Sequence, residues 1–366
     1  MSGVYVHVPY CASRCGYCDF NTYVAPASER EGFAALAILE VAHAARVLEG
    51  PLDTVFFGGG TPTLLPPGDL IAILRAIDRT IGLAPNAEIT TEANPDSVDA
   101  AALTALREAG FTRISFGMQS AVPGVLATLD RHHTAGRAAA AASEARAAGF
   151  AHVSLDLIYG TPGETDADWQ TSLDAVVAAA PDHASAYPLT VERGTKLHAR
   201  VRRGELPAPD PDVQARRYAM ADRDFAAAGL RWYELFNWAR AGSECRHNLG
   251  YWRSADWWGI GPGAHSHVAG TRWWNVRRPA DYARRLQAGE SPQAGREKLA
   301  PAQVRLERTM LEIRLAAGLD PTLAGDLAAM TRLREEGLLE RTGEGRHVLT
   351  ADGRRAADRV VTVLTG

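Results

Sequence analysis

Apolar and polar residues follow one another along the first 200 residues in a pattern that predicts strands alternating with helices. The opening stretch 4–8 (VYVHV) alternates strictly, so its three valines share one face while Tyr5 and His7 share the other. Further strands are expected at 52–57, 87–95, 111–120, 151–160 and 182–190. Helices are expected between them, at 33–48, 69–81, 97–109, 136–148 and 164–179. About six strand–helix units predict an α/β fold with a parallel sheet wrapped by helices.

The pattern changes after residue 200. Residues 202–212 are polar and proline-rich, which predicts a linker or lid, and a helix at 214–228 and a strand at 231–239 follow. Seven of the eight tryptophans then lie between Trp232 and Trp274. This density fits either a flat apolar wall for a planar ligand or a domain interface.

The last part of the chain, 301–366, predicts two helices at 301–316 and 325–336, a hairpin that turns at 343–345, and a final helix after Asp352. This order resembles a winged-helix module, for which DNA binding is one interpretation and a structural cap on the first domain is the other. Its arginines are interleaved with acids, which favours the cap. We therefore expect three parts, at 1–200, 201–300 and 301–366.

Composition narrows the class of protein. The 366 residues are 46% hydrophobic and 22% charged, with a formal net charge of −4 and a pI near 6.3, so no overall attraction to nucleic acid or an anionic membrane is expected. The first residues lack the basic and apolar regions of a signal peptide, and no run of about 18 apolar residues occurs. The chain has only four cysteines, so we expect a cytoplasmic protein in a reducing compartment. Because of the net charge, we expect no nucleic-acid partner.

Three of the cysteines, Cys11, Cys15 and Cys18, are spaced C-x3-C-x2-C directly after the first strand. This spacing brings three thiolates onto one tight loop, one ligand short of a closed tetrahedral site, as in an iron–sulfur cubane with one open iron. A structural zinc site that adds His7, a redox pair at Cys15 and Cys18, and a disulfide with Cys245 are the alternatives.

Polar residues interrupt the apolar strands near their carboxyl ends, namely Glu92, Gln119 and Asp156. A carboxylate in a buried strand is costly unless it is paired, so these residues indicate either a polar ligand or an ion pair with an arginine such as Arg113. The glycines of GGGTP, at 58–62, either let backbone amides approach a ligand or form a tight turn.

Together, the cysteine spacing with Tyr17 and Phe20, the Y-x-H-x-P-x-C strand, GGGTP, H-N-x-x-Y-W at 247–252 and GIGPGAHS at 259–266 resemble one branch of the radical S-adenosylmethionine (SAM) superfamily. That branch contains oxygen-independent coproporphyrinogen III oxidase and the haem chaperone HemW, and HemW is the more similar. The resemblance implies an open six-stranded (β/α)6 partial barrel with ligands at the strand carboxyl ends, and a 4Fe-4S cluster on the three cysteines with SAM at the open iron.

The resemblance also implies the ligand-contacting residues. The positions that match SAM contacts are Tyr5, Gly59, Gly60, Thr61, Glu92, Gln119, Arg131 and Asp156, and Arg131 would meet the SAM carboxylate. Haem would be cargo, with His247 as the axial ligand because neutral imidazole suits iron. Cys245, His265 and His267 are the alternative ligands.

The function implied is a haem chaperone that delivers haem to recipient haem proteins, membrane-bound ones included, with a homodimer left open. The alternatives are an oxidoreductase of the coproporphyrinogen III oxidase type and a related radical SAM methyltransferase. The oxidases carry a further cysteine two residues after the third cluster cysteine, where this chain has Phe20. They also have an N-terminal extension over the substrate, whereas this chain begins directly at the first strand. Both differences favour the chaperone.

Overall fold

The computed structural model describes residues 1–134, 136–323 and 327–366, and its main feature is one twelve-stranded sheet. Six adjacent parallel strands form the centre of this sheet, in the order β1-β4-β5-β6-β7-β8. Their bounds are β1 Ser2–Val8, β4 Leu52–Gly59, β5 Leu83–Ala93, β6 Arg113–Gln119, β7 His152–Tyr159 and β8 His183–Pro188. The α/β fold predicted from the alternation of strands and helices is therefore confirmed.

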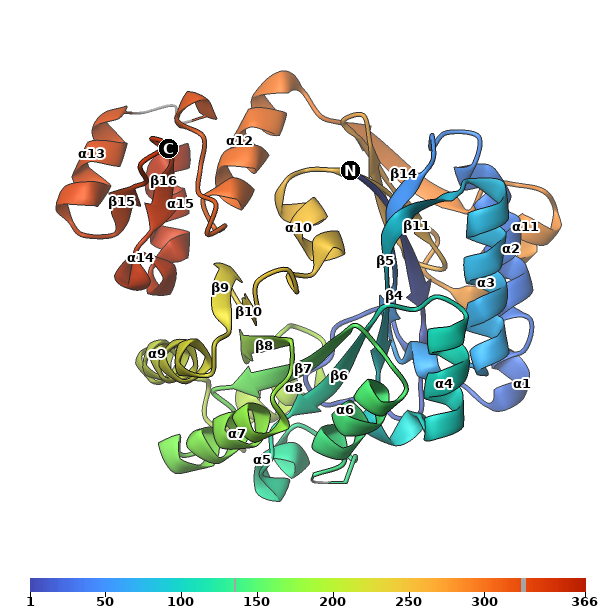
Figure 1. Ribbon diagram of the computed structural model, residues 1–366, viewed down its shortest axis with the longest axis horizontal. Helices are drawn as coiled ribbons and strands as arrows, with labels where there is room; N and C mark the ends of the chain where they lie inside the picture. The colour runs from blue at the N-terminus through green and yellow to red at the C-terminus, as the bar shows by residue number, and fades with distance from the viewer. Residues whose placement is uncertain (135, 324–326) are drawn as a thin grey trace.

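Helices cover the outer side of the curved sheet (Figure 1). They are α1 Ala27–Arg30, α2 Phe33–Ala44, α3 Pro67–Thr80, α4 Ala100–Glu108, α5 Pro123–Thr128, α6 Arg137–Ala147 and α7 Asp166–Ala179. The apolar face of β1 packs against this layer, since Val4, Val6 and Val8 have no exposed surface. Tyr5 therefore points to the opposite, inner side of the sheet, as the strict alternation of the sequence predicts.

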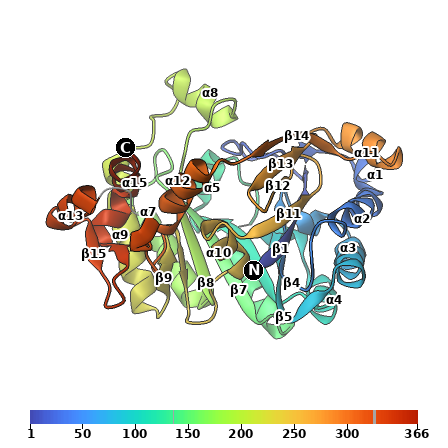
Figure 2. The same ribbon diagram turned by 90° about the horizontal axis from the view of Figure 1, so that it is seen from above.

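Short elements complete this part of the chain. A two-residue parallel pair, β2 Tyr10–Cys11 and β3 Tyr23–Val24, brackets the cysteine loop. The 3₁₀ helices η1 Pro62–Leu64 and η2 Pro95–Ser97 follow β4 and β5. Beyond β8, α8 Lys196–Arg202 projects from the body (Figure 2) and α9 Pro211–Ala227 begins where the polar, proline-rich segment ends.

Residues 201–300 extend the same sheet at both edges rather than forming a sheet of their own. At one edge β10 Asn237–Ala239 pairs antiparallel with β8, and β9 Arg231–Glu234 pairs with β10. The single strand expected at 231–239 is thus two strands. At the other edge β11 Asp256–Ile260 lies parallel to β1 and leads to three antiparallel strands. These and the nearby helices are β12 His265–Val268, β13 Thr271–Asn275, β14 Gln293–Lys298, α10 Arg246–Trp252 and α11 Pro279–Gln287.

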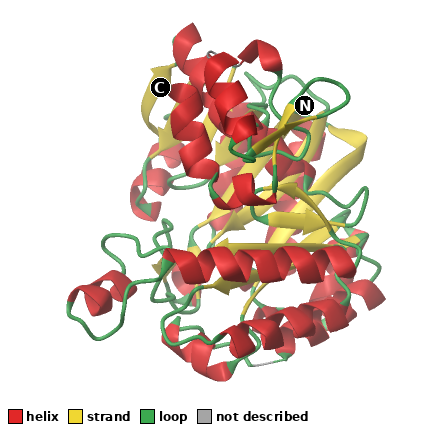
Figure 3. Cartoon of the chain, turned by 90° about the vertical axis from the view of Figure 1, so that its left-hand side faces the viewer, coloured by secondary structure: helices red, strands yellow, loops and turns green. Residues whose placement is uncertain are grey.

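The C-terminal module follows the expected order of two helices and a hairpin, but a 3₁₀ helix precedes the second helix, and the single helix expected after Asp352 is two short helices. It comprises α12 Pro301–Glu312, η3 Pro321–Leu323, α13 Leu327–Glu335, the hairpin β15 Leu339–Arg341 and β16 His347–Leu349, α14 Ala351–Arg355 and α15 Ala357–Thr365. The expected helix 325–336 includes residues 325 and 326, which lie outside the described residues. Both chain termini lie at the same end of the molecule (Figure 3). In the described parts of the chain, no helix has the length and apolar character needed to cross a membrane.

Candidate functional site

A cavity of about 1180 Å³ lies on the inner side of the sheet. It exceeds the usual range of roughly 300 to 1,000 Å³ for a site that holds one small ligand. The cavity brings together every residue for which the sequence predicts a cluster or SAM contact. Its lining includes Cys11, Cys15, Cys18, Tyr5, Gly59, Gly60, Thr61, Glu92, Gln119, Arg131 and Asp156.

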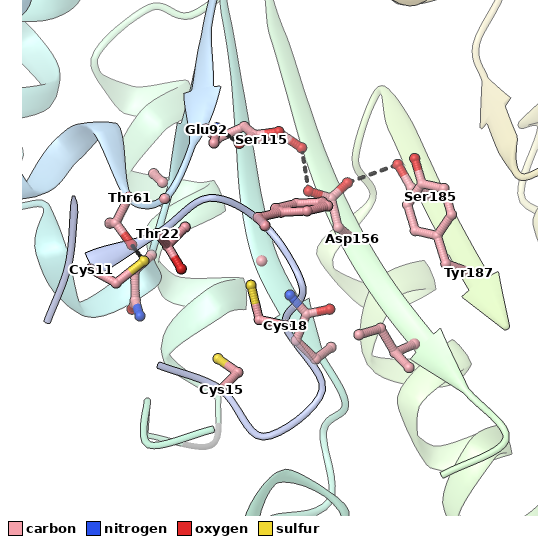
Figure 4. Close-up of a pocket in the computed structure, with 18 of the residues that line it drawn as sticks. Cys11, Cys15, Cys18, Thr22, Thr61, Glu92, Ser115, Asp156, Ser185 and Tyr187 are labelled. Carbon is pink, nitrogen blue, oxygen red and sulfur yellow. Dashed lines mark hydrogen bonds between the residues drawn. The ribbon is translucent and has the colours of Figure 1, made fainter. Parts of the chain in front are cut away.

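The three cysteines of the loop face a common space opposite β7 (Figure 4). All three are free thiols. Backbone hydrogen bonds hold the loop from both sides, from Gly16 N–H to the Leu129 carbonyl (3.0 Å) and from Leu197 N–H to the Gly16 carbonyl (2.8 Å). Tyr17 packs into a small apolar cluster that includes Leu129 and Leu197. The loop is therefore fixed by α5 and α8 before any metal binds.

The zinc alternative lacks a fourth ligand of the expected kind. Both ring nitrogens of His7 are engaged, Nδ1 with the Tyr5 hydroxyl (3.1 Å) and Nε2 with the Asn21 carbonyl (3.0 Å). Among the described residues, no three His, Cys, Asp or Glu side chains are arranged around one metal-ion position. His7 could therefore serve as a fourth zinc ligand only by giving up one of its two contacts with Tyr5 and Asn21.

The GGGTP turn follows β4 and packs against the segment that leads into the cysteine loop. Gly59 has φ 106°, and a Cβ there would lie 2.4 Å from His7 Nδ1, so this position requires glycine. Its N–H donates to Glu92 Oε2 at 3.1 Å. The Gly60 and Thr61 N–H groups donate to the carbonyls of Val8 and Tyr10. The Thr61 hydroxyl lies 3.9 Å from Cys11 Sγ (Figure 4). The turn thus places a threonine hydroxyl against the first cysteine.

Two acidic side chains, Glu92 and Asp156, share the wall opposite the cysteines. Burial, together with the nearby Asp156 carboxylate, raises the pKa of Glu92 to about 7. Burial also raises the pKa of Asp156, against the effect of serine hydroxyls that donate to it. Ser115 donates to Oδ2 at 2.7 Å and Ser185 to Oδ1 at 2.8 Å (Figure 4). Such perturbed acids in a cavity are typical of a binding site.

The ion-pair alternative for these acids is not formed. Arg113 instead pairs with Glu88, with Nε 3.1 Å from Oε2, and donates to the carbonyls of Ser243 and Glu244. Sequence reasoning missed the serines around Asp156. Ser115 lies on β6 and Ser185 directly opposite Asp156 on β8. The available signal was a serine within each of two otherwise apolar strands. The strand register was needed to show that both serines lie beside Asp156.

Arg131 lies between the cysteine loop and β6. Its Nη1 is 3.6 Å from Cys15 Sγ, its Nη2 donates to the Gly117 carbonyl (2.9 Å), and its Nε donates to His133 Nδ1 (3.1 Å). A Cβ on Gly117 would meet both Arg131 Nη2 and Gln119 Nε2 at under 3 Å, namely 2.7 and 2.8 Å. Gln119 itself adopts φ 62° at the end of β6. The guanidinium is thereby held in a fixed orientation beside the cysteine loop.

His247 lies behind the cavity wall rather than in the cavity, and it is 3% exposed. Nδ1 is 2.8 Å from the Thr54 hydroxyl, Nε2 is 2.9 Å from the Tyr251 hydroxyl, and the ring stacks on Phe56 with centroids 5.2 Å apart. Burial lowers the pKa of His247 to about 4. Iron coordination would require breaking one of two buried hydrogen bonds. These contacts favour a structural role over the predicted haem ligation.

The other predicted haem ligands differ in position. Cys245 lines the cavity, but its thiol donates to Glu88 Oε1 (3.6 Å) and burial raises its pKa, so it stays protonated. His265 stacks on Trp274, and His267 Nδ1 lies 3.2 Å from the Ala255 carbonyl. Neither of these histidines lines the cavity.

The tryptophans pack within the fold rather than around the cavity. Trp238 has no exposed surface, and Trp258 packs edge-on against Trp273 with ring centroids 4.8 Å apart. Along the described chain, the cavity lining includes no tryptophan. Of the two interpretations of the tryptophan-rich segment, the structure therefore supports packing between elements.

Comparisons with known proteins agree with this site. A model of the radical SAM superfamily matches residues 5–176. The chain is 52% identical over 375 residues to the haem chaperone HemW of Mycobacterium tuberculosis, covering all of this chain and 95% of that protein. It is 36% identical to HemW of Synechocystis, covering 95% and 88% of the two chains. The structure of coproporphyrinogen III oxidase (HemN) from Escherichia coli superposes with a TM-score of 0.85 at 21% identity, over 100% and 90% of the two chains. At that identity the match shows a common fold.

Proposed function

The chain belongs to the haem chaperone HemW family within the radical SAM superfamily, and from this premise we propose that it binds haem and delivers it to recipient haem proteins. The single observation that carries the proposal is the identity of 52% to a haem chaperone over the whole chain. The cavity supports it, because its volume of about 1180 Å³ is large enough for a second ligand beside SAM.

The cluster and SAM belong to the same proposal. Cys11, Cys15 and Cys18 are open thiols on a fixed loop, and they would hold a 4Fe-4S cluster. Such a cluster would supply an open iron for the amino and carboxylate groups of SAM. Arg131, fixed beside Cys15, would pair with the carboxylate of SAM.

The remaining polar wall would hold the rest of SAM. Glu92 and Asp156 would accept hydrogen bonds from its hydroxyl and amino groups, which would hold both acids in their charged forms. Tyr5, Gly59, Gly60, Thr61 and Gln119 would contact the same ligand from β1, the glycine turn and the end of β6.

Porphyrinogen oxidation is the second candidate, and the fold shared with HemN is the observation that favours it. At position 20, where the oxidases of this branch carry a further cysteine, the chain has a phenylalanine that lines the mouth of the cavity and is 61% exposed. A phenyl ring supplies an apolar contact but neither a proton nor a thiolate. This difference favours binding of a macrocycle over its oxidation.

Anaerobic reconstitution of the cluster, followed by parallel assays of haem binding and coproporphyrinogen turnover, tests the proposal. We expect stoichiometric haem binding without turnover. Conversion of coproporphyrinogen to protoporphyrinogen at a rate comparable to haem loading would contradict the chaperone and support the oxidase. A matched preparation without SAM separates turnover that depends on SAM from background oxidation.

The partners follow from the same function. Recipients would be haem proteins, including membrane-bound ones, and the chaperone itself would act in the cytoplasm. A homodimer is compatible with this proposal. Size measurement of the reconstituted protein with and without haem would establish the oligomeric state.

A further inference from the structure

The histidines differ in how many of their ring nitrogens remain available to a metal. Three of the eleven line the cavity: His132, His133 and His183. His183 uses both nitrogens, Nδ1 with the Ser154 hydroxyl (2.7 Å) and Nε2 with the Tyr233 hydroxyl (2.8 Å). His133 accepts from Arg131 on Nδ1 and is 7% exposed. Within the described residues, His132 has no hydrogen-bond partner and is the exposed imidazole of the three.

The short loop that carries His132 is held on both sides. Arg131 N–H donates to the Leu126 carbonyl (2.9 Å), and Thr134 N–H donates to Asp96 Oδ2 (3.2 Å). The Arg131 guanidinium bridges to His133 and to the Gly117 carbonyl. The imidazole of His132 is therefore free while its backbone is fixed, so binding a ligand would cost little ordering of the chain.

Two aromatic rings are exposed at the same cavity. Phe20 is 61% exposed and Tyr187 is 42% exposed, and both line the cavity that His132 lines. Exposed large apolar side chains at a cavity mouth are typical of a ligand contact. Arg14, also exposed and lining the cavity, donates to the Cys18 carbonyl (3.3 Å) and keeps its positive charge free for an anionic group.

We propose that His132 is the axial ligand of haem iron at the mouth of the cavity, with Phe20 and Tyr187 against the macrocycle and Arg14 near a propionate. The inference rests on the proposed haem-chaperone function and assigns its ligand. A neutral imidazole donates a nitrogen lone pair to iron, and a planar apolar ring buries aromatic surface. This arrangement leaves the buried hydrogen bonds of His247 intact.

The test is haem titration of the reconstituted protein, followed by magnetic circular dichroism of the haem bands. We expect His132→Ala to lose the imidazole-ligated spectrum while the cluster absorption and the far-ultraviolet circular dichroism are unchanged. His265→Ala, which removes an exposed histidine outside the cavity, is the matched control and should bind haem as the wild type does. Free imidazole should restore ligation in His132→Gly.

The outcomes separate the inference from the function on which it rests. If the wild type binds no haem, the proposed function fails and the inference with it. If the wild type binds haem and His132→Ala keeps the same spectrum, the chaperone function stands and the ligand assignment is overturned. Loss of the spectrum in His247→Ala, with His132→Ala unchanged, also overturns it.

The macrocycle contact has its own control. Phe20→Ser should weaken haem binding without changing the type of spectrum, because it removes ring contact but not the ligand. Val24→Ser changes another apolar residue of equal exposure, 61%, that does not line the cavity, and it should leave haem binding unchanged. Equal haem binding by both variants would contradict the placement of the ring.

Discussion

Glu88 and Glu92 lie four residues apart on β5, yet only one of them has a counter-ion. Glu88 receives the Arg113 guanidinium and the N–H groups of Arg246 and His247. Glu92 receives a single N–H, from Gly59, and faces another acid. A buried acid with so little compensation is costly to the fold. We infer that Glu92 serves to bind a ligand, whereas Glu88 serves to stabilise the fold.

Glu92→Gln should therefore stabilise the SAM-free protein. The pKa of Glu92 is raised from 4.5 to about 7, so the charged form penalises the native state above pH 7, and the penalty disappears as pH falls toward 4.5. At pH 8 we expect a gain of roughly 1 to 3 kcal/mol, because the carboxyl lines the cavity and is partly solvated. Denaturant unfolding at pH 8 and pH 4.5 measures this gain in the free energy of unfolding. The same substitution should abolish SAM binding.

Glu88→Gln is the matched control, and it should change the free energy of unfolding in the opposite direction. It leaves the buried Arg113 charge without its counter-ion, and we expect the free energy of unfolding to fall by about 3 to 5 kcal/mol. Equal effects of the two substitutions at pH 8 would contradict the separation into ligand-binding and structural acids.

Cys15→Ala should abolish the broad visible absorption of the reconstituted protein, because the remaining two loop thiols cannot hold a cubane. Cys245→Ala should keep that absorption, since its thiol is buried against Glu88. Iron and sulfide analysis of both variants provides the measurement. A colourless, zinc-loaded wild type would contradict the cluster assignment.

Because of His247, the free energy of unfolding should depend on pH in the acid range. Its pKa in the fold, about 4, is below the usual 6.5, so between these values the unfolded chain binds more protons than the native one. Stability is full above pH 6.5 and falls as pH drops toward 4, by about 3 kcal/mol from this group. His247→Gln should lose less stability over that window than the wild type does. His265→Gln should have a smaller effect, because burial lowers the pKa of His265 by less than that of His247. Parallel slopes in the wild type and His247→Gln would contradict the assignment.

Much of the site at this scale was predictable from sequence, because the cysteine spacing is local and an acid in an apolar strand is conspicuous. The partners of those residues were not. The serines around Asp156 come from neighbouring strands, and the Thr54 hydroxyl meets His247 across 193 positions of sequence. Only the strand register and the path of the chain bring these groups together.

At the scale of elements, the glycine turn after β4 is hydrogen-bonded to the segment that leads into the cysteine loop. Gly59→Ala should cost roughly 2 kcal/mol or more, because the φ of 106° disfavours a Cβ and that atom would collide with His7. Gly68→Ala, at a site in α3 with nothing within 4 Å of a Cβ, should be neutral or up to about 1 kcal/mol more stable. Thermal unfolding distinguishes them, and equal melting temperatures would contradict a strained turn.

Most elements of the barrel were predictable from their periodicity to within a few residues, since each strand is buried and each helix begins or ends near a glycine or proline. The edges of the sheet were not. β11 pairs in parallel with β1, more than 250 positions earlier in the chain (Ser2 opposite Asp256). The stretch 231–239 folds back into β9 and β10. An apolar run does not show which strand it will pair with, because the pairing depends on the whole chain.

At the scale of the molecule, the C-terminal module is joined to the barrel through the β9–β10 turn. Its apolar core includes Leu235, with Phe236 packed against it. A β-bridge between Glu234 and Leu315 continues the contact. These contacts support the interpretation of the module as a structural cap, and the sequence could only offer it beside DNA binding.

The side chain of Arg354 makes several of the contacts between the C-terminal module and the barrel. Arg354 of α14 donates to both carboxylate oxygens of Asp222 on α9, each at 2.7 Å. Its guanidinium also lies 4.6 Å from the centre of the Trp232 ring. The same Asp222 accepts from Trp238 Nε1 at 2.8 Å. Loss of the guanidinium would leave a half-buried carboxylate with one weaker donor.

We therefore expect Arg354→Ala to lower the free energy of unfolding by about 2 to 4 kcal/mol and to loosen the module from the barrel. Arg355→Ala removes a neighbouring arginine whose partner, Asp352, is on the same helix and largely exposed, so it should change stability by less than about 0.5 kcal/mol. Limited proteolysis and denaturant unfolding measure the two effects. Because the contact lies on α9 and β9 rather than at the cysteine loop, the visible spectrum of the reconstituted Arg354→Ala protein should be unchanged. If Arg354→Ala is as stable as Arg355→Ala, the module does not depend on this contact for its attachment.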